Sequence, residues 1–285
     1  MYELMRVSGI FPNIIIDDYG GFHTRNSSVE AFIQLMFKRF YRSFQGKRLD
    51  FFIYTGDQCE RVSSLASQAP VFAFSTTKEL RGKIIPIPDF VYTGWPEVGV
   101  ESWEKAIPQY KKRASLPYED SRSFWIGNIE THESREILLR LSSAYPHVLQ
   151  ARGITWPKSI PGSFYQPANY VSIPDHAKYK SLIDIRGVGY SARLKLLMHL
   201  GRPIFLVDRP YEEFFYPYMK PYKHYIPVKK DMSDLIEKIK WLHSDPHAYR
   251  KLAASTRQFA DKYLSKSFAL SYLHYVVIRF GTIAP

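Results

Sequence analysis

The sequence predicts an α/β protein built from two lobes with parallel sheets that face a cleft, closed by helices at the C-terminal end. Two observations predict this class. In both halves of the chain, short apolar runs alternate with segments whose apolar residues recur at helical spacing. With 285 residues, 45% of them hydrophobic, the chain is also long enough to bury the cores of two medium domains.

The first half begins as a β-α-β unit. A helix is predicted over 28–42, where Phe32, Leu35, Met36 and Phe40 recur at three- and four-residue spacing. The runs that favour strands are branched or aromatic and are followed by turn residues, and they lie at 13–16, 51–54, 71–74 and 83–86. The polar, basic, proline-flanked segment 108–123 is predicted to cross between the lobes.

The second half contains one compact βαβ unit followed by helices. A strand is predicted at 181–185, a helix at 192–200 that Gly201 ends, and a strand at 203–207. Further helices are expected at 231–242, at 246–264 with Asp245 as its cap, and from about 268 to 280. The expected domains are 1–115, 116–265, and a C-terminal helix in 266–285 that packs back on the first.

The net charge of +12 predicts an affinity for phosphorylated molecules or polyanions. Nucleic acid is disfavoured as a partner, because the basic clusters are short and scattered. Cys59 is the single cysteine, which excludes an internal disulfide and favours a reducing compartment. No secretory leader and no membrane span is predicted, so we expect a cytoplasmic protein.

A glycine loop is the clearest candidate site. Arg186-Gly187-Val188-Gly189-Tyr190-Ser191-Ala192-Arg193 lies between the strand at 181–185 and the helix at 192–200. Small residues let a ligand approach the backbone, and a helix start with an arginine beside it attracts a phosphate. Two other interpretations stay open: a tight turn with a solvated Arg193, and a G-x-G-x-x-A dinucleotide loop with Asp208 as the acid that binds the ribose.

Longer strings carry a resemblance to a family. From His176 onward, HAKYKSLIDIRGVGYSARLK and YEEFFYPYMKPYKHYIPVKKDMSDLIEKI resemble the C-terminal half of glycosyltransferase family 90, which includes Rumi-like protein O-glucosyl- and O-xylosyltransferases and capsule-associated xylosyltransferases. Across about 25–265, SSVEAFI, FIYTGDQ, PVFAFSTT, FWIGN and THESR follow the family's order. The resemblance implies two Rossmann-like lobes of the GT-B type and an inverting, metal-free transfer without a cofactor. The chain looks like the compact members from large algal DNA viruses.

The resemblance assigns residues by position. Asp57 falls on the catalytic base, Arg135 on an arginine that contacts the nucleotide diphosphate, and Val188, Gly189, Tyr190, Ser191, Ala192 and Arg193 on the nucleotide loop. Asn128 stands where the family has a Gly-Ser-Arg string, one residue further from the arginine. Glu213 is assigned to the ribose because it follows a strand of the nucleotide lobe. Phe90, Tyr92 and Trp95 are assigned to the face that contacts the sugar or acceptor.

Each assignment has an ordinary alternative. Asp57 is also a good turn residue after Gly56, Glu213 is also a common opening residue of an exposed helix, and aromatic rings most often pack in a core.

The implied reaction moves a sugar, xylose before glucose, from a UDP-sugar to a hydroxyl of a glycan or glycoprotein. The competing functions are an NAD(P)-dependent oxidoreductase and a carbohydrate-binding protein without activity.

Overall fold

The chain folds into two compact units, each described separately below. The computed structural model describes residues 3–21, 23–155 and 170–283. Unit 1 consists of Met1–Trp95, Pro210–Pro217 and Ser265–Pro285, and unit 2 consists of Pro96–Arg209 and Tyr218–Leu264. The predicted α/β class is confirmed. The division falls between Trp95 and Pro96, about twenty residues before the expected boundary, and the segment 210–217 belongs to unit 1 although it interrupts unit 2.

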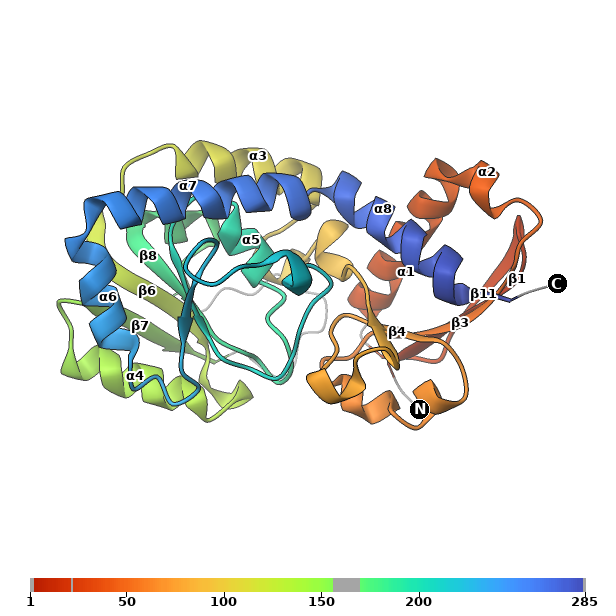
Figure 1. Ribbon diagram of the computed structural model, residues 1–285, viewed down its shortest axis with the longest axis horizontal. Coiled ribbons are helices and arrows are strands. Elements are labelled where there is room, and N and C mark those ends of the chain that lie inside the picture. Colours follow the sequence, from red (N-terminus) through yellow and green to blue (C-terminus); the bar gives the residue numbers. More distant parts are fainter. Residues whose placement is uncertain (1–2, 22, 156–169, 284–285) are drawn as a thin grey trace. The chain divides into compact units, whose positions relative to one another are not determined.

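Unit 1 contains a mixed sheet, shown with labels in Figure 1. Its main path runs through β2 (Asn13–Asp18), β1 (Leu4–Ile10), β3 (Arg48–Tyr54), β4 (Val71–Ala73) and β5 (Ile84–Pro86). β1 is antiparallel to β2 and β3, β11 (Thr282–Ile283) is antiparallel to β3, and only β3, β4 and β5 are parallel. The prediction of a parallel sheet is therefore wrong for this unit, because β1 and β2 form a hairpin around Phe11 and Pro12.

Helices α1 (His23–Arg39), α2 (Tyr41–Phe44) and α8 (Lys266–Val276) belong to unit 1. α1 buries Phe32, Ile33 and Met36 at the predicted spacing, while Leu35 is exposed. α8 lies against α1, as Figure 1 shows. Arg39 Nη2 donates to Ser267 Oγ at 2.9 Å, and the Phe40 and His274 rings stack at 4.2 Å. The C-terminal helix is thus part of the first unit.

Unit 2 contains five parallel strands. Their order is β10 (Ile226–Val228), β9 (Ile204–Val207), β8 (Tyr179–Asp184), β6 (Asp120–Asn128) and β7 (Leu149–Ile154). The chain runs from β6 outward to β7, then returns past β6 to β8 and continues the other way. The winding direction therefore reverses between β6 and β8, and open α/β sheets bind ligands outside the carboxyl ends of the strands at such a reversal.

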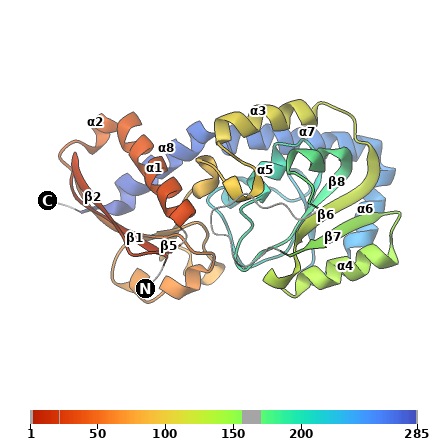
Figure 2. The ribbon, with the colours of Figure 1, turned by 180° about the vertical axis from the view of Figure 1, so that it is seen from behind.

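Five helices surround this sheet: α3 (Trp103–Ala114), α4 (Ser134–Ala144), α5 (Leu194–Met198), α6 (Leu235–Ser244) and α7 (Pro246–Tyr263), seen from behind in Figure 2. Leu138 of α4, Ile239 of α6 and Leu252 of α7 share one core with the strands. Asp245 Oδ1 accepts hydrogen bonds from the backbone of His247 and Ala248, at 3.0 and 2.9 Å. This cap of α7 confirms the prediction.

The predicted crossover at 108–123 is wrong. Most of it is occupied by α3 and by the start of β6, with Pro108 inside the helix. The helix is stable despite its proline because Trp103, Ala106, Ile107, Tyr110 and Ala114 are buried along one face. Short 3₁₀ turns complete the described fold, at Cys59–Val62, Leu65–Ser67, Lys78–Leu80, Phe90–Tyr92, Pro96–Val98, Ile129–Thr131, Pro174–Lys178 and Tyr216–Tyr218, and a π turn spans Val277–Gly281.

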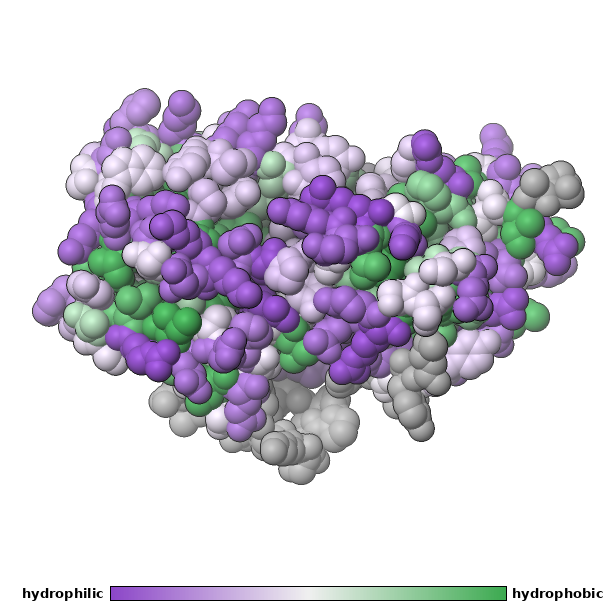
Figure 3. Space-filling model, turned by 60° about the horizontal axis from the view of Figure 1, so that its bottom comes forward, coloured by the Kyte–Doolittle hydropathy of each residue, from purple (hydrophilic) through white to green (hydrophobic). Residues whose placement is uncertain are grey.

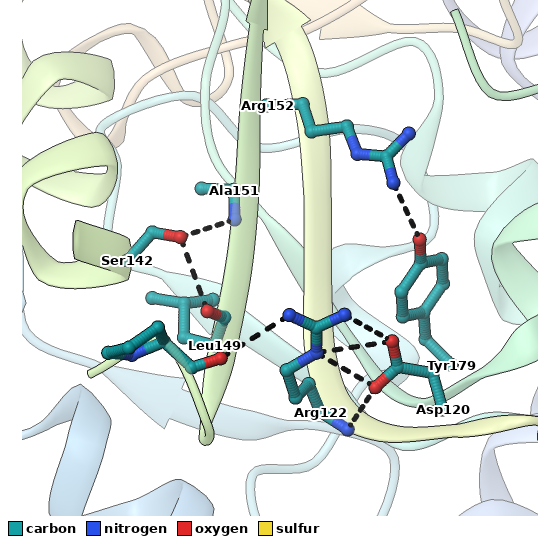
Figure 4. A network of polar contacts seen from close by, with 8 residues as sticks. Asp120, Arg122, Ser142, Leu149, Ala151, Arg152 and Tyr179 are labelled. Atoms are coloured by element: carbon teal, nitrogen blue, oxygen red, sulfur yellow. Dashed lines mark hydrogen bonds and ion pairs between the residues drawn. The ribbon is translucent and has the colours of Figure 1, made fainter. Parts of the chain in front are cut away.

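A polar network near the start of β6 fastens this part of unit 2 (Figure 4). Arg122 forms an ion pair with Asp120 at 2.6 Å and donates to Pro146 O at 3.3 Å. Ser142 of α4 donates to Leu149 O and accepts from the backbone N–H of Ala151. The Ser142 bonds join α4 to β7, and the bond from Arg122 to Pro146 ties β6 to the turn between α4 and β7.

The surface is largely polar. On the face drawn in Figure 3, hydrophilic residues predominate and hydrophobic ones form small separate patches. No helix within residues 3–21, 23–155 and 170–283 has the length and apolar character needed to cross a membrane.

Unit 2 should lose stability in mild acid because it buries His176 and His199 and half-buries His243. Burial, with nearby cations adding to it, lowers the pKa of His176 to about 3 and those of His199 and His243 to about 4. In the unfolded chain all three take up protons near pH 6.5, while the folded chain stays unprotonated down to about pH 4. The free energy of unfolding should therefore fall with decreasing pH across this window, by about 1.4 kcal/mol per pH unit for each histidine.

Urea unfolding at pH 7, 6 and 5 checks this expectation. His199→Leu should remove one proton's contribution from the slope of the unfolding free energy against pH. His247→Leu, at an exposed position of α7, should leave this slope unchanged. Equal slopes in all three proteins would contradict the account.

Candidate functional site

Four arginines gather around one buried carboxylate in unit 2. This arginine cluster comprises Arg135 on α4, Arg186 and Arg193 in the glycine loop after β8, and Arg209 after β9; the carboxylate is Asp184, the last residue of β8. The electrostatic influence of Arg186, Arg193, Arg209 and Asp184 all reaches Arg135. The cluster therefore lies at the carboxyl ends of the strands, at the reversal between β6 and β8.

Asp184 fixes the conformation of the glycine loop through its hydrogen bonds and ion pairs. Its side chain is fully buried; Oδ1 accepts a hydrogen bond from Ser191 Oγ at 2.8 Å, and Oδ2 pairs with Arg209. Arg193 Nε lies 4.0 Å from Oδ1. A buried carboxylate is stable only when paired and hydrogen-bonded, so these contacts hold the loop and the end of β9 in a fixed arrangement.

Arg135 links two strand ends. Its side chain is 8% exposed, and it donates to Asn128 O at 2.6 Å and to Arg186 O at 3.1 and 2.9 Å. The guanidinium lies 5.4 Å from the centre of the Trp125 ring. Burial and repulsion from Arg193 lower its pKa to about 9, so it keeps its charge at neutral pH.

Arg193 is the cluster member with the clearest capacity for a ligand. Its side chain is 16% exposed, and Nη1 donates to Ile126 O. Nε has no hydrogen-bond partner among the residues that the structure describes. Burial lowers its pKa. This guanidinium is held at the carboxyl ends of the strands and keeps an unused N–H. Such a group is suited to a bidentate contact with phosphate oxygens.

Positive charge is concentrated in this cluster. Arg193, Arg209 and Arg186 all repel the charge on Arg135, and such a concentration of guanidiniums in a partly desolvated place attracts an anion. The helix after the loop adds little, because α5 has five residues where nine were predicted. The arginines are therefore the clearest source of positive charge at this site, and a contribution from the helix start stays a prediction.

The other predicted loop residues support this arrangement. Val188 is exposed, whereas Tyr190 and Ser191 are buried, and the backbone of Ala192 accepts from Lys195 Nζ at 3.1 Å. Gly189 is buried within the loop. A Cβ at Gly127, on β6, would lie 2.7 Å from the Trp125 ring and 3.2 Å from Arg135 Nη1. Glycine at that position lets Arg135 pack against the strand.

Asn128 is placed in the site mainly through its backbone. It ends β6, and its carbonyl accepts from Arg135. Its side-chain oxygen accepts from the backbone N–H of Glu130 at 3.0 Å, which caps the following turn.

Asp57 lies in unit 1, in an irregular loop after β3. Its carboxylate is 31% exposed, and Oδ1 accepts from Arg25 Nη1 at 2.8 Å. A Cβ at Gly56 would lie 2.3 Å from Tyr54 Oη and 2.4 Å from Glu3 Oε2. A side chain there would have to displace the ends of Tyr54 and Glu3, so the loop turns closely over the strand and presents Asp57 beyond its carboxyl end.

The three predicted aromatic residues have different surroundings. Tyr92 is fully buried against Phe32 in unit 1, which favours a core role, and its assignment to a sugar-binding face stays a prediction. Phe90 is also buried, but its ring contacts Arg25 at 5.0 Å and Trp95 at 5.6 Å. Of the three residues, only Trp95 is partly exposed.

Glu213 lies in a different unit from the one that the sequence predicts. It lies in the segment 210–217, which belongs to unit 1, and is 2% exposed. Its neighbour Glu212 pairs with Thr76 through two backbone hydrogen bonds and with Arg81 through an ion pair. The segment is thus fastened to unit 1, and the assignment of the buried Glu213 to the ribose stays a prediction.

Cys59 follows Asp57 closely but is not a nucleophile. It is 1% exposed, and burial with the nearby Glu60 raises the pKa of its thiol to about 12.

Sequence reasoning missed four polar residues that organise these sites: Arg25, Asn26, Asp184 and Arg209. Asp184 gave a usable signal, since a carboxylate stands within an otherwise apolar strand, two residues before Arg186. Arg25 and Asn26 stand before the predicted start of the first helix, and their contacts with residues about thirty positions later have no local signature.

Comparison with known proteins gives the family. The model of "Glycosyl transferase family 90" matches residues 16–284. Protein O-glucosyltransferase 1 of Rattus norvegicus is 31% identical over 255 residues, which cover 85% of this chain and 63% of that protein. O-glucosyltransferase rumi of Drosophila melanogaster is 35% identical over 195 residues, which cover 64% of this chain and 47% of that protein.

The chain thus spans about half to two thirds of the length of these relatives. Among solved structures, a mutant of TarM from S. aureus is 12% identical, with a TM-score of 0.49 over 75% of this chain and 45% of that one. The family match extends over nearly the whole sequence, including Asp57, Arg135 and the glycine loop. The chain belongs to glycosyl transferase family 90.

Proposed function

We propose that this protein transfers a sugar from a UDP-sugar to a hydroxyl group of a glycan or glycoprotein. The arginine cluster is the observation that carries the proposal: four guanidiniums and one buried carboxylate lie at the reversal between β6 and β8. A nucleoside diphosphate carries the localised negative charge that this arrangement lacks.

In the proposed reaction, Asp57 is the base. The acceptor oxygen forms a bond to the anomeric carbon of the donor as its proton passes to the Asp57 carboxylate. The bond between that carbon and the β-phosphate oxygen breaks, and its electron pair leaves with UDP. Attack from the face opposite UDP inverts the configuration and yields a β-linked product.

The arginine cluster supports the leaving group. Negative charge on the β-phosphate grows as the bond breaks, and preorganised guanidiniums stabilise this charge more strongly than they stabilise the bound donor. Arg193 is assigned to the diphosphate oxygens directly, while Arg135 contributes charge and holds the loop. We further propose that no metal is needed, because the arginines supply the positive charge.

The sugar is the finer part of the proposal. The resemblance favours xylose before glucose, whereas the relatives named above are O-glucosyltransferases. A pentose and a hexose differ by one hydroxymethyl group, a difference that a pocket discriminates by only about 1–3 kcal/mol. We therefore propose UDP-xylose or UDP-glucose as the donor.

The test is release of UDP from UDP-xylose, UDP-glucose, UDP-galactose and UDP-N-acetylglucosamine, measured in EDTA with ADP-glucose as control. One or two UDP-sugars should be consumed and ADP-glucose left intact. Failure to consume any UDP-sugar in EDTA, with consumption restored by Mg²⁺ or Mn²⁺, would refute metal independence. Binding of NADH with no binding of UDP would instead support the oxidoreductase.

A further inference from the structure

We propose that Arg25 is a positioning residue that aims the Asp57 carboxylate at the acceptor hydroxyl. This inference rests on the function proposed above and adds to it a residue outside the predicted set. Its basis is a chain of contacts within unit 1 that runs from the sheet through α1 to the carboxylate.

The Asp57 side chain depends on one hydrogen bond for its direction. It stands in an irregular stretch between β3 and the 3₁₀ turn at Cys59. Within the described residues, its carboxylate accepts one hydrogen bond, from Arg25 Nη1 to Oδ1 at 2.8 Å. Oδ2 is left to accept a proton. A carboxylate on a loop otherwise rotates among several staggered positions, so the contact with Arg25 selects one of them.

The Arg25 guanidinium is itself held in place. Its side chain is 19% exposed and lies 5.0 Å from the centre of the Phe90 ring. Phe90 is buried and meets Trp95 edge to face at 5.6 Å. A cation over an aromatic face is attracted to the ring, more strongly when desolvated, so this contact restricts the otherwise flexible side chain.

The next residue, Asn26, anchors the helix that carries Arg25. Asn26 is 2% exposed; its Nδ2 donates to Asp18 Oδ1 at 2.7 Å, and its Oδ1 accepts from Thr55 Oγ1 at 2.7 Å. Asp18 ends β2 and Thr55 directly follows β3. A fully bonded buried amide thus fixes the first turn of α1 against the strand end that leads to Asp57.

Arg25 and Asp57 are therefore placed by the same strand ends, and the carboxylate keeps a fixed direction without help from a ligand. The exposed Arg61 offers a matched comparison in the same unit. Its side chain is 65% exposed, and its ion pair with Glu3 is 3.9 Å long. Within the described residues it forms no hydrogen bond or ion pair with Asp57, so its removal should leave the carboxylate in place.

The experiment compares Arg25→Met, Arg25→Lys and Arg61→Met, each alone, and Arg25→Met combined with Asp57→Asn. The measured quantities are kcat for transfer, Kd for UDP, and the thermal unfolding midpoint. Arg25→Met should lower kcat roughly 10- to 100-fold, the cost of misplacing a reacting group, and change Kd for UDP less than twofold. Arg25→Lys should be intermediate, and Arg61→Met should match wild type.

The double variant separates positioning from a general structural role. If Arg25 acts through Asp57, Arg25→Met should cost nothing further once Asp57 is Asn. Full kcat in Arg25→Met, or a loss that multiplies with that of Asp57→Asn, would overturn the inference. If Arg25→Met does not fold, Arg25→Lys carries the test: wild-type kcat would overturn the inference, and reduced kcat at unchanged Kd would support it. An inactive wild type would instead refute the proposed function itself.

Discussion

Asp57→Asn should lower kcat for sugar transfer by about 10²- to 10⁴-fold, the range that a general base contributes. The change removes the proton acceptor but keeps the shape of the side chain and an oxygen that can accept from Arg25. Kd for UDP should stay within twofold of wild type, because the diphosphate is assigned to unit 2. Transfer kinetics at saturating donor and acceptor, with calorimetric titration of UDP, measure both quantities.

Asp50→Asn is the matched control. Asp50 is also paired with an arginine in unit 1, at 2.9 Å to Arg6, and its side chain is 32% exposed, close to the 31% of Asp57. It lies within β3, before the carboxyl end of the strand. Its substitution should leave kcat unchanged. An Asp57→Asn enzyme with wild-type kcat would eliminate the assigned base and would favour the alternative of a turn residue.

Arg193→Ala should weaken UDP binding by roughly 10- to 150-fold. The estimate follows from about 1.5–3 kcal/mol for hydrogen bonds to a charged group. The fold should survive, because Asp184 retains its bonds to Ser191 and Arg209. The affinity of Arg193→Lys for UDP should lie between those of wild type and Arg193→Ala, since an ammonium keeps the charge but loses the planar fork that matches a phosphate. Calorimetric titration of UDP into the three proteins measures the effect.

Arg250→Ala supplies the control for net charge. Arg250 is exposed on α7 of the same unit, so its removal lowers the total charge equally without touching the cluster. Its Kd for UDP should equal that of wild type at 0.15 M salt, where distant surface charges are screened. Equal losses in Arg193→Ala and Arg250→Ala would show that UDP responds to overall charge only.

Local patterns predicted those elements whose burial follows a simple period. The helix at 246–264 was correct because Asp245 and Pro246 mark its start, and the β8 and β9 strands were correct because continuous apolar runs are typical of a buried parallel sheet. The helix α3 was missed because its basic exposed face and Pro108 outweighed the buried stripe in the sequence. Of the β1–β2 hairpin, only the second strand was predicted. The apolar run at 13–16 does not indicate which strand it pairs with or in which direction.

The site was predictable where its residues are neighbours in sequence. The glycine loop and Arg193 were visible as one string, and the resemblance added Asp57 and Arg135. Arg209 could not be predicted in this way, because its pairing with Asp184 joins the ends of two strands, and the two residues are 25 positions apart. Glu213 was placed in the wrong unit because the chain leaves unit 2 at Pro210 for eight residues, and this excursion leaves no mark in composition.

Calorimetric titration of the wild-type protein with UDP, uridine and NADH in EDTA tests the central claim most directly, namely that the arginine cluster holds a nucleoside diphosphate. UDP should bind, and uridine should bind at least tenfold more weakly, because it lacks the groups that the guanidiniums contact. Equal affinity for UDP and uridine, or binding of NADH alone, would contradict the account.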